Sequence, residues 1–343
     1  MKGFASDNYA GVLPEVMVAL HKANKEHAPS YGVDAITQRV TQQLKDFFEV
    51  DLEVCFVFNG TGANVLSLSA ATSSYQSVFC TDVSHLYNDE STAPETFTGC
   101  RLIPIPADSN GKLPIELLQQ KIIRKGDIHF AQPKVISITQ STEYGTLYTP
   151  EEIRAISDFA QQHQLYLHMD GSRFFNALAA IGGSPSSISS KAGVDILSLG
   201  GTKLGMLYGE AVVVFNKELV PAIRYKQKQA MQLSSKTRFV AAQFEALLQN
   251  DLWRKTAIHS NEMAQTLYHL LQEIPQVEVT MPVKANVIFA KLPKSIIASM
   301  QALFPFYIWD EATNEVRLMC SFDTSKEEVE AFALHLKKLF EAQ

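Results

Sequence analysis

The alternation of short β-rich runs with longer helical patterns is the feature that most limits how this chain can fold. The helical pattern Pro150–Gln162 begins with strong signals, since Thr149 is a good N-cap and Pro150 suits the first helical position. Such alternation is typical of βαβ units, so the sequence predicts an α/β fold with a mainly parallel sheet. The predicted strands are Val54–Phe58, Val78–Cys80, Val135–Thr139, Leu165–Met169, Ile196–Leu199 and Ala211–Phe215, and the predicted helices between them include Ala63–Ser73, Pro114–Lys121 and Pro150–Gln162.

The pattern changes beyond Phe239. A long helical stretch runs to about Leu271, and shorter β-rich runs and a final helix follow it. A chain of 343 residues also exceeds the length at which one hydrophobic core usually stops growing. We therefore predict a large domain of residues 1–238, which includes the N-terminal segment, and a smaller α+β domain of residues 239–343. The predicted elements of the smaller domain are Val277–Met281, Val287–Lys291, Val316–Met319 and the helix Lys326–Phe340.

Composition narrows the class of ligand. Apolar residues make up 46% of the chain and charged residues 19%, which is the profile of a soluble globular protein. The formal net charge of −6 comes without a basic run, so nucleic acid and membrane surfaces are not expected as partners. The four cysteines form no CxxC pair, and the N-terminus lacks an apolar signal segment. We expect a cytoplasmic protein with reduced thiols, a small-molecule ligand and no metal site.

The segment CFVFNGTGANVLSL, residues 55–68, indicates an anion site. It passes from an apolar strand through Asn59, Gly60, Thr61 and Gly62 into a helix. Free backbone N–H groups and the positive end of the helix dipole converge there, which favours a phosphate group. Taken alone, the motif fits equally well a tight turn that needs glycine only for its backbone shape.

Two further strands end on residues that carry chemistry. The apolar run that starts at Leu165 ends on Asp170, and the run that starts at Asp195 leads through two glycines to Lys203. Each residue alone has a simpler interpretation, as a strand-end cap or as a surface lysine. However, α/β proteins bind ligands at the carboxyl ends of their strands, and the glycines let the backbone approach a ligand closely.

A phosphate site, a carboxylate and a lysine in this order are what pyridoxal phosphate (PLP) requires. The helix end binds the phosphate, and the carboxylate of Asp170 keeps the pyridine nitrogen protonated as an electron sink. Lys203 forms a Schiff base with the aldehyde carbon. The combination is far more specific than its parts, so we predict PLP as the cofactor.

At these residues the sequence resembles the fold-type I PLP enzymes, and specifically the threonine aldolase group of the β-eliminating lyases. The resemblance implies an aspartate aminotransferase-like large domain and a smaller α+β C-terminal domain. It covers nearly the whole chain. The matching blocks are FASDNYAG, YGVDAIT, FNGTGAN, TDVSHLYNDE with TAPE, QPKVISITQSTEYGTLY, LHMDGSRFFNA, LSLGGTKLGM with GEAV, and EVRLMCSFDT.

The resemblance implies a role for each matching residue at the cofactor. Lys203 would carry PLP, Asp170 would pair with the pyridine nitrogen, and Gly60, Thr61 and Gly62 would form the phosphate cradle. In the same way, His85 would stack over the cofactor ring near the substrate hydroxyl group, and Lys228 would help to bind phosphate.

On the substrate side, the resemblance gives two arginines. Arg173, in DGSR where the family commonly shows DGAR, would lie near the cofactor's phenolic oxygen and the substrate carboxylate. Arg317, from the smaller domain, would bind the substrate α-carboxylate with its planar guanidinium. Ser6 matches a position that reaches the substrate, while Tyr31 and Asp34 match a block that helps to complete the site across a subunit interface.

Glu143 of QSTEYG is a departure from the family pattern. Many threonine aldolases carry a second active-site histidine at about this position. We therefore predict that His85 is the main histidine acting near the β-hydroxyl group, with Glu143 as the alternative base.

The resemblance implies cleavage of L-threonine, L-allo-threonine and related β-hydroxy-α-amino acids to glycine and an aldehyde. It also implies a homotetramer, built as a dimer of dimers with shared active sites. Two alternatives stay open, because the residues that hold PLP are shared among many activities. One is another PLP chemistry, such as β-elimination or transamination, and the other is a catalytically silent binding protein with the same fold.

Overall fold

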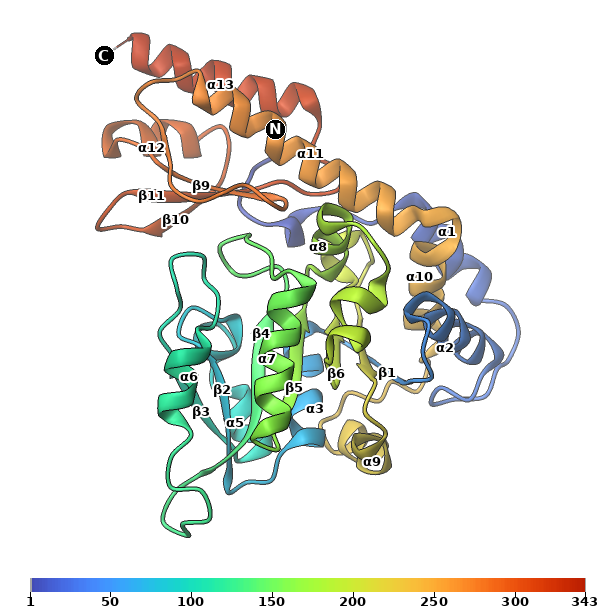
Figure 1. Ribbon diagram of the computed structural model, residues 1–343. Coiled ribbons are helices and arrows are strands. Elements are labelled where there is room, and N and C mark those ends of the chain that lie inside the picture. The colour runs from blue at the N-terminus through green and yellow to red at the C-terminus, as the bar shows by residue number, and fades with distance from the viewer. Residues whose placement is uncertain (1, 343) are drawn as a thin grey trace.

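Two β-sheets organise the chain, and the computed structural model describes residues 2–342 (Figure 1). The larger sheet has seven strands in the order β1-β7-β6-β5-β4-β2-β3. Every neighbouring pair from β3 to β6 is parallel, whereas β7 is antiparallel to both β6 and β1. Six strands therefore run in one direction, which confirms the predicted α/β fold with a mainly parallel sheet. The strands are β1 (Glu53–Val57), β2 (Gln76–Thr81), β3 (Arg101–Ile105), β4 (Gln132–Thr139), β5 (Tyr166–Gly171), β6 (Ile196–Leu199) and β7 (Glu210–Val214).

Helices cover both faces of this sheet because its strands carry apolar residues on both sides. Along β6, Leu197 and Leu199 belong to one core cluster and Ile196 to the other. The first cluster is covered by α1 (Pro14–Ala23), α2 (Ala35–Phe48), α6 (Ile115–Lys121), α7 (Pro150–Gln162), α8 (Phe174–Ile181) and α10 (Arg238–Leu248). The second is covered by α3 (Gly60–Ala71), α4 (His85–Asn88), α5 (Ala93–Thr98) and α9 (Val220–Gln229).

The alternation along β5 decides which way the predicted carboxylate points. Leu167 and Met169 belong to the first core cluster, so His168 and Asp170 point to the opposite face, toward α3. The helix that starts at the glycine-rich turn therefore lies against the face that carries Asp170.

The smaller sheet has four antiparallel strands in the order β10-β11-β9-β8. One face is covered by three helices around a core of its own, which includes Ile288, Val316 and Leu318. The other face carries Phe289 and Arg317, which are paired across β9 and β11, and it lies toward the larger domain (Figure 1). The elements are α11 (Leu252–Gln272), β8 (Glu278–Val279), β9 (Val287–Lys291), α12 (Lys294–Gln301), β10 (Tyr307–Asp310), β11 (Glu315–Met319) and α13 (Lys326–Glu341).

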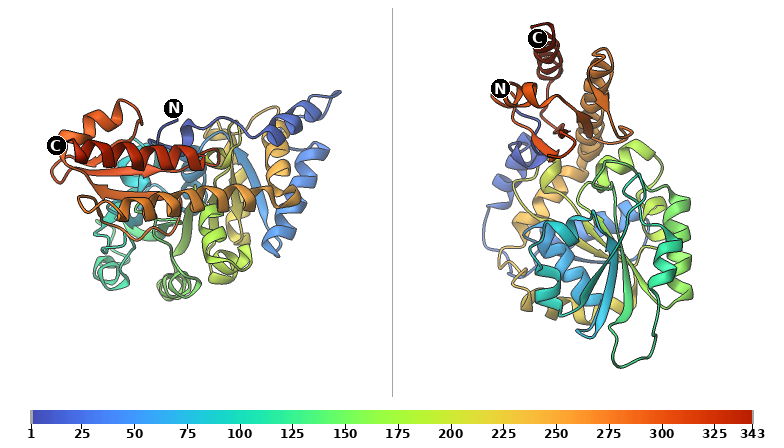
Figure 2. Two further views of the ribbon diagram at one scale, coloured as in Figure 1. Left: turned by 90° about the horizontal axis from the view of Figure 1, so that it is seen from above. Right: turned by 90° about the vertical axis from the view of Figure 1, so that its left-hand side faces the viewer.

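Two segments join the two cores. Trp253, in the first turns of α11, packs in the larger core, and Leu271, near its end, packs in the smaller one, as the course of this helix in Figure 2 illustrates. At the other end of the chain, Phe4 packs in the smaller core, and its carbonyl accepts a hydrogen bond from Met319 N–H at 2.8 Å. Because α11 contributes to both cores, the boundary after residue 238 stays a prediction.

Several elements differ from the sequence prediction. The helical stretch beyond Phe239 is not continuous, because Asn250 and Asp251 adopt left-handed backbone angles between α10 and α11. Strand β3 was not predicted, since it contains Pro104 and lies at the sheet edge, where proline is tolerated. Strand β10 and helix α12 were not predicted either. Six short 3-10 helices complete the structure: η1 (Asp7–Tyr9), η2 (Pro185–Ile188), η3 (Ser190–Ala192), η4 (Thr202–Leu204), η5 (Lys217–Leu219) and η6 (Gln249–Asp251).

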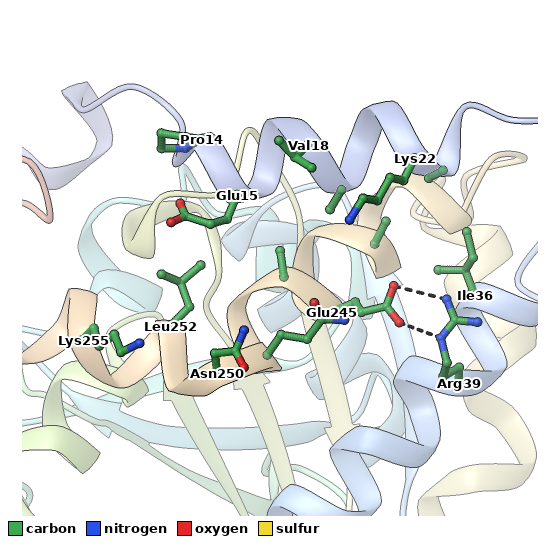
Figure 3. A pocket seen from close by; sticks show the side chains of 15 residues that line it. Pro14, Glu15, Val18, Lys22, Ile36, Arg39, Glu245, Asn250, Leu252 and Lys255 are labelled. Carbon is green, nitrogen blue, oxygen red and sulfur yellow. Dashed lines mark hydrogen bonds and ion pairs between the residues drawn. The ribbon is translucent and has the colours of Figure 1, made fainter.

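A groove of about 580 Å³ lies between α1, α2, α10 and the start of α11 (Figure 3). Arg39 on α2 donates to both carboxylate oxygens of Glu245 on α10, at 2.6 and 3.2 Å, and so ties the two helices together. The residues that line the groove include none of the predicted site residues. Among residues 2–342, none of the helices combines the length and the apolar character that crossing a bilayer requires.

Candidate active site

The carboxyl ends of five strands bring the predicted site residues to one edge of the larger sheet. Gly60 follows β1, His85 follows β2, Glu143 follows β4, Asp170 lies near the end of β5, and Lys203 follows β6. Because these strands run in one direction, their carboxyl ends meet at the same edge. The smaller domain lies above this edge in Figure 1. The site is therefore formed where the two domains face each other.

The turn into α3 has the geometry of an anion site. Asn59 is the N-cap residue, and its side chain accepts a hydrogen bond from Gly62 N–H at 2.7 Å. The N–H groups of Gly60 and Thr61 have no acceptor within the helix, so they are available to a phosphate. A Cβ atom at Gly62 would meet the end of the flexible Gln232 side chain, which would have to move aside.

Asp170 is buried but held in its charged form. Its Oδ2 atom accepts a hydrogen bond from Asn64 Nδ2 at 3.0 Å, and its Oδ1 atom accepts one from Ser172 N–H at 3.0 Å. Burial alone would raise the pKa of the carboxyl group. The Asn64 amide, the positive charges of His85 and Lys203 and the Ser172 N–H outweigh burial and hold the pKa below its usual value.

His85 lies between two carboxylates. Its Nδ1 atom is 3.0 Å from Glu90 Oε1, and its backbone N–H donates to Glu143 Oε1 at 3.2 Å. The hydrogen bond with Glu90 is the main cause of a raised His85 pKa. Burial opposes this shift, and the negative charges of Asp170, Glu143 and Glu90 add to it. The imidazole can therefore gain and lose a proton in the range where base catalysis operates.

Lys203 lies in η4, two residues after Gly201. A Cβ atom at Gly200 would collide with the Ser172 backbone, so the lysine loop packs tightly on the Asp170 loop. Burial and the positive charge of Arg173 lower the pKa of the Lys203 amine against the opposing effect of nearby carboxylates. A lowered pKa favours the neutral amine, which is the form that attacks an aldehyde carbon.

Glu210, at the start of β7, anchors the same loop from the neighbouring strand. Its Oε2 atom accepts a hydrogen bond from Gly201 N–H. Burial raises the pKa of Glu210 to about 7, against the hydrogen bonds from Gly201 and Thr202 and the charge of Lys203. The carboxyl group thus ties the backbone next to Lys203 to the antiparallel strand.

The two arginines differ in how they are paired. Arg173 donates through Nε and a terminal nitrogen to both oxygens of Asp7, at 2.8 and 2.9 Å. Asp7 also accepts a hydrogen bond from Asn286 at 3.2 Å. Asp7 takes two of the five N–H donors of the guanidinium, so the other three, on the two terminal nitrogens, are left for a ligand. The substrate role of Arg173 stays a prediction.

Arg317 has no such carboxylate partner. It stacks over the rings of Tyr307 and Trp309, at 5.4 and 5.3 Å from their centroids, and donates one weak hydrogen bond to Ala5 O at 3.4 Å. Its Nε atom is buried and has no hydrogen-bond partner in the described part of the chain. A buried cationic donor without an acceptor favours an anionic ligand.

Four of the predicted residues lie away from this cluster or have local roles. Ser6 is the N-cap of η1 and accepts from Asn8 N–H. Asp34 is buried as the N-cap of α2, with both oxygens bound to Thr37. The Lys228 ammonium lies 5.0 Å from the centroid of the exposed Tyr31 ring. The ligand roles of these four residues, Ser6, Tyr31, Asp34 and Lys228, stay predictions.

Sequence reasoning missed the residues that connect the site. Asp7 lies inside a quoted block, but its partner Arg173 is far away in the chain, so only the fold reveals the pair. Asn64 and Glu90 also lie inside quoted blocks. An acidic or amide residue within an otherwise apolar helix, as Asn64 is in α3, is a usable signal, because buried polar groups need partners.

These residues fit pyridoxal phosphate. The open N–H groups at α3 match a phosphate, the charged Asp170 matches a protonated ring nitrogen, and Lys203 has the lowered pKa that attack on an aldehyde requires. No group of three or more histidine, cysteine or acidic side chains that could hold a metal ion is found in residues 2–342.

Comparison with known proteins identifies the class to which this fold and site belong. The family model of the β-eliminating lyases matches residues 3–293. The chain therefore belongs to the β-eliminating lyase family, and it has the fold of the PLP-dependent enzymes.

Within this family the chain is similar to low-specificity L-threonine aldolases. It is 42% identical over 335 residues to the one from Pseudomonas aeruginosa, covering 97% of this chain and 96% of the relative. It is 40% identical over 340 residues to one from a Pseudomonas species, covering 99% and 98%. A solved structure of Leishmania major threonine aldolase superposes with a TM-score of 0.93 at 28% identity, covering 99% of both chains.

A more distant structure shows the same fold only. Tryptophan decarboxylase from Catharanthus roseus superposes with a TM-score of 0.81 at 13% identity, covering 99% of this chain and 84% of that one. The scaffold is thus shared by different activities, and the substrate side of the site must decide between them.

Proposed function

We propose that this chain uses PLP to cleave L-threonine, L-allo-threonine and related β-hydroxy-α-amino acids to glycine and an aldehyde. The observation that carries the proposal is that a charged Asp170 and a Lys203 of lowered pKa meet at one edge of the larger sheet, while Arg317 on the smaller domain keeps a buried Nε–H donor without an acceptor in the described residues. The extensive identity to low-specificity L-threonine aldolases supports the same reaction class.

On the cofactor side, Gly60, Thr61 and Gly62 would hold the phosphate and Lys203 would carry PLP. PLP, when bound, supplies an electron sink for the bond that breaks. Asp170 keeps that sink effective, because a carboxylate of lowered pKa stays charged next to a protonated ring nitrogen. His85 would stack over the cofactor ring.

On the substrate side, Arg317 would bind the α-carboxylate. The guanidinium has a free Nε–H donor, and its carbon lies 5.4 and 5.3 Å from the centroids of the Tyr307 and Trp309 rings. The two rings restrict where the guanidinium can lie, so an arriving carboxylate would meet donors that are already positioned. Fixing the carboxylate fixes which bond of the α-carbon faces the ring plane.

His85 would remove the proton of the β-hydroxyl group as the Cα–Cβ bond breaks. A threonine hydroxyl group does not release its proton unaided at neutral pH, so a positioned base is needed. Glu143 is the alternative base, since its carboxylate lies beside the His85 backbone. In either case the group that takes up the proton lies at the carboxyl edge of the larger sheet, as Asp170 does.

We also propose that the protein assembles as a homotetramer, a dimer of dimers with shared active sites. Among the apolar side chains with half or more of their surface exposed are Tyr31, at 51%, Val33, at 61%, and Met231, at 67%. The Tyr31 N–H donates to Ser235 O, which joins the segments that carry these residues. Analytical ultracentrifugation tests this proposal, and a monomer at all concentrations would contradict it.

An aldehyde-release assay over a panel of β-hydroxy-α-amino acids tests the function. The PLP-loaded protein should release acetaldehyde from L-threonine or L-allo-threonine and the corresponding aldehydes from analogues with other β-substituents. Lys203→Ala is the matched control and should release none. If the wild-type protein binds PLP but releases aldehyde from no member of the panel, the proposed function is wrong.

A further inference from the structure

In the described part of the chain, the buried carboxylate of Glu90 forms hydrogen bonds only with side chains of the site, both through Oε1, and its buried Oε2 atom has no partner. Its side chain has no exposed surface, and its Oε1 atom is 3.0 Å from His85 Nδ1 and 2.8 Å from Asn64 Nδ2. A carboxylate that serves only the fold would be expected to bind backbone N–H groups, as Glu95 does with Leu102 N–H. Glu90 is instead connected to the chemistry of the site.

Asn64 connects Glu90 to the cofactor side. Its Nδ2 group has two N–H donors, and its two acceptors are Glu90 Oε1 at 2.8 Å and Asp170 Oδ2 at 3.0 Å. The amide therefore bridges two buried carboxylates that would otherwise repel each other. Because this uses both donors, the side chain cannot turn without losing one of these two hydrogen bonds.

The hydrogen bond between Glu90 and His85 has a direction. An ionised carboxylate can only accept, so the proton between the two must reside on His85 Nδ1. In neutral imidazole the second nitrogen, Nε2, then carries no proton and is the basic atom. A partner that fixes the tautomer therefore also fixes which nitrogen can act as a base.

We propose that Glu90 is a positioning residue, which holds His85 as the Nδ1–H tautomer with Nε2 as the basic nitrogen and is itself held by Asn64. This inference rests on the role proposed above for His85. Glu90 does not touch the reacting atoms. It acts through His85, in the manner in which a carboxylate orients a catalytic imidazole in hydrolases.

The surroundings of His85 set the expected pH effects. The charged groups that act on its ring are Glu90 from the segment after α4, Glu143 from the loop after β4 and Asp170 from β5. Glu90→Gln keeps the size and an acceptor oxygen but removes the charge of the group that contributes most. The pKa of His85 should therefore fall in the variant, and the acid limb of the rate profile should move to lower pH.

The test measures the His85 pKa directly in the PLP-loaded protein. The slow exchange of the imidazole Cε1 proton, followed by mass spectrometry of the peptide that contains His85, reports this pKa across pH. Glu90→Gln should lower the His85 pKa and reduce kcat by at least about tenfold. The loss should stay smaller than the ~10²–10⁴-fold loss expected when a proton-transfer group itself is removed. Glu95→Gln, the same change five positions away, should alter neither value.

An unchanged His85 pKa in Glu90→Gln would overturn the proposal. If that variant does not fold, nuclear magnetic resonance of isotope-labelled histidine in the wild-type protein decides, with His85→Phe identifying the signal. The Nδ1–H tautomer is expected, and the Nε2–H tautomer would overturn the proposal. Neither measurement depends on turnover, so a failure of the proposed aldol cleavage would be seen separately, in the aldehyde assay.

Discussion

The edge of the larger domain and the face of the smaller domain that covers it differ in how their charged side chains are paired. On the larger domain, Asp170 is paired with Asn64 and Ser172, and Arg173 is paired with Asp7. On the smaller domain, Arg317 lies against the rings of Tyr307 and Trp309, and its buried Nε atom has no acceptor in the described residues. The charged side chains of Asp170 and Arg173 are therefore paired within the chain, whereas that of Arg317 is open to an anion.

The difference suggests a division of labour. A permanently bound cofactor needs partners that stay in place, so the fold itself can fix them at the strand ends. A substrate that comes and goes needs a donor that is oriented but not yet satisfied. Breaking the first side should therefore abolish chemistry, and breaking the second should weaken substrate use while the cofactor stays bound.

The largest effect is expected for Lys203→Ala. Without the amine, PLP has no covalent attachment, so the variant should lose aldehyde release. It should also lose the visible absorption band that borohydride bleaches in the wild-type protein. An absorption spectrum before and after borohydride measures this. A band in the variant that is still present and still reducible would show that another residue carries the cofactor.

Asp170→Asn also tests the larger domain's side of the site. An amide cannot hold a ring nitrogen protonated, so the variant should bind PLP but lose activity. Cofactor content by absorbance and turnover by aldehyde release are measured together. Full activity with bound PLP would remove the electron-sink role from Asp170.

The next effect separates His85 from Glu143. His85→Phe keeps a ring over the cofactor, His85→Asn removes it, and Glu143→Gln removes only a charge. Substitution of the true base should reduce kcat by ~10²–10⁴-fold with PLP still bound, and we expect this loss at His85. If Glu143→Gln is inactive while His85→Phe keeps most of its turnover, Glu143 is the base and His85 only stacks on the ring.

Arg317→Gln tests the smaller domain's side of the site, where the guanidinium has no acidic partner among the described residues. Losing a charge-assisted hydrogen bond of about 1.5–3 kcal/mol should lower kcat/KM for threonine at least about tenfold. PLP affinity should hardly change, because Arg317 lies on the smaller domain. Steady-state kinetics and PLP titration check both statements. A collapse of PLP affinity with substrate affinity intact would place Arg317 on the cofactor side.

The smallest effect concerns Glu210, below the lysine loop. Burial raises its pKa from 4.5 to about 7 in the folded protein. Its contribution to stability is therefore complete below about pH 4.5 and is lost as pH rises through about 7, by about 3 kcal/mol at most. Denaturant unfolding of wild-type protein and Glu210→Gln should differ in pH dependence across that window. Parallel curves would show that Glu210 titrates normally.

The sequence allowed prediction of the cofactor side better than of the substrate side. Thr149 with Glu152 forms a capping box, and α7 has the predicted bounds, because caps are local signals. The position of Asp170 and Lys203 at the sheet edge was predictable for a related reason, since each lies at or shortly after the end of a recognisable apolar strand, while their roles at the cofactor stay predictions. By contrast, the pairing of Asp7 with Arg173 joins residues that only the tertiary fold brings together. The stacking of Arg317 depends on β10, a strand that was not predicted.

Product analysis with L-threonine tests the central claim most directly. The PLP-loaded protein is incubated with the amino acid, and all carbon products are quantified over time. Retro-aldol cleavage predicts glycine and acetaldehyde in equal amounts, with no ammonia released and no 2-oxo acid formed. Formation of 2-oxobutanoate with ammonia would assign β-elimination to this site, a 2-oxo acid formed with transfer of the amino group would assign transamination, and either result in place of glycine and acetaldehyde would contradict the account.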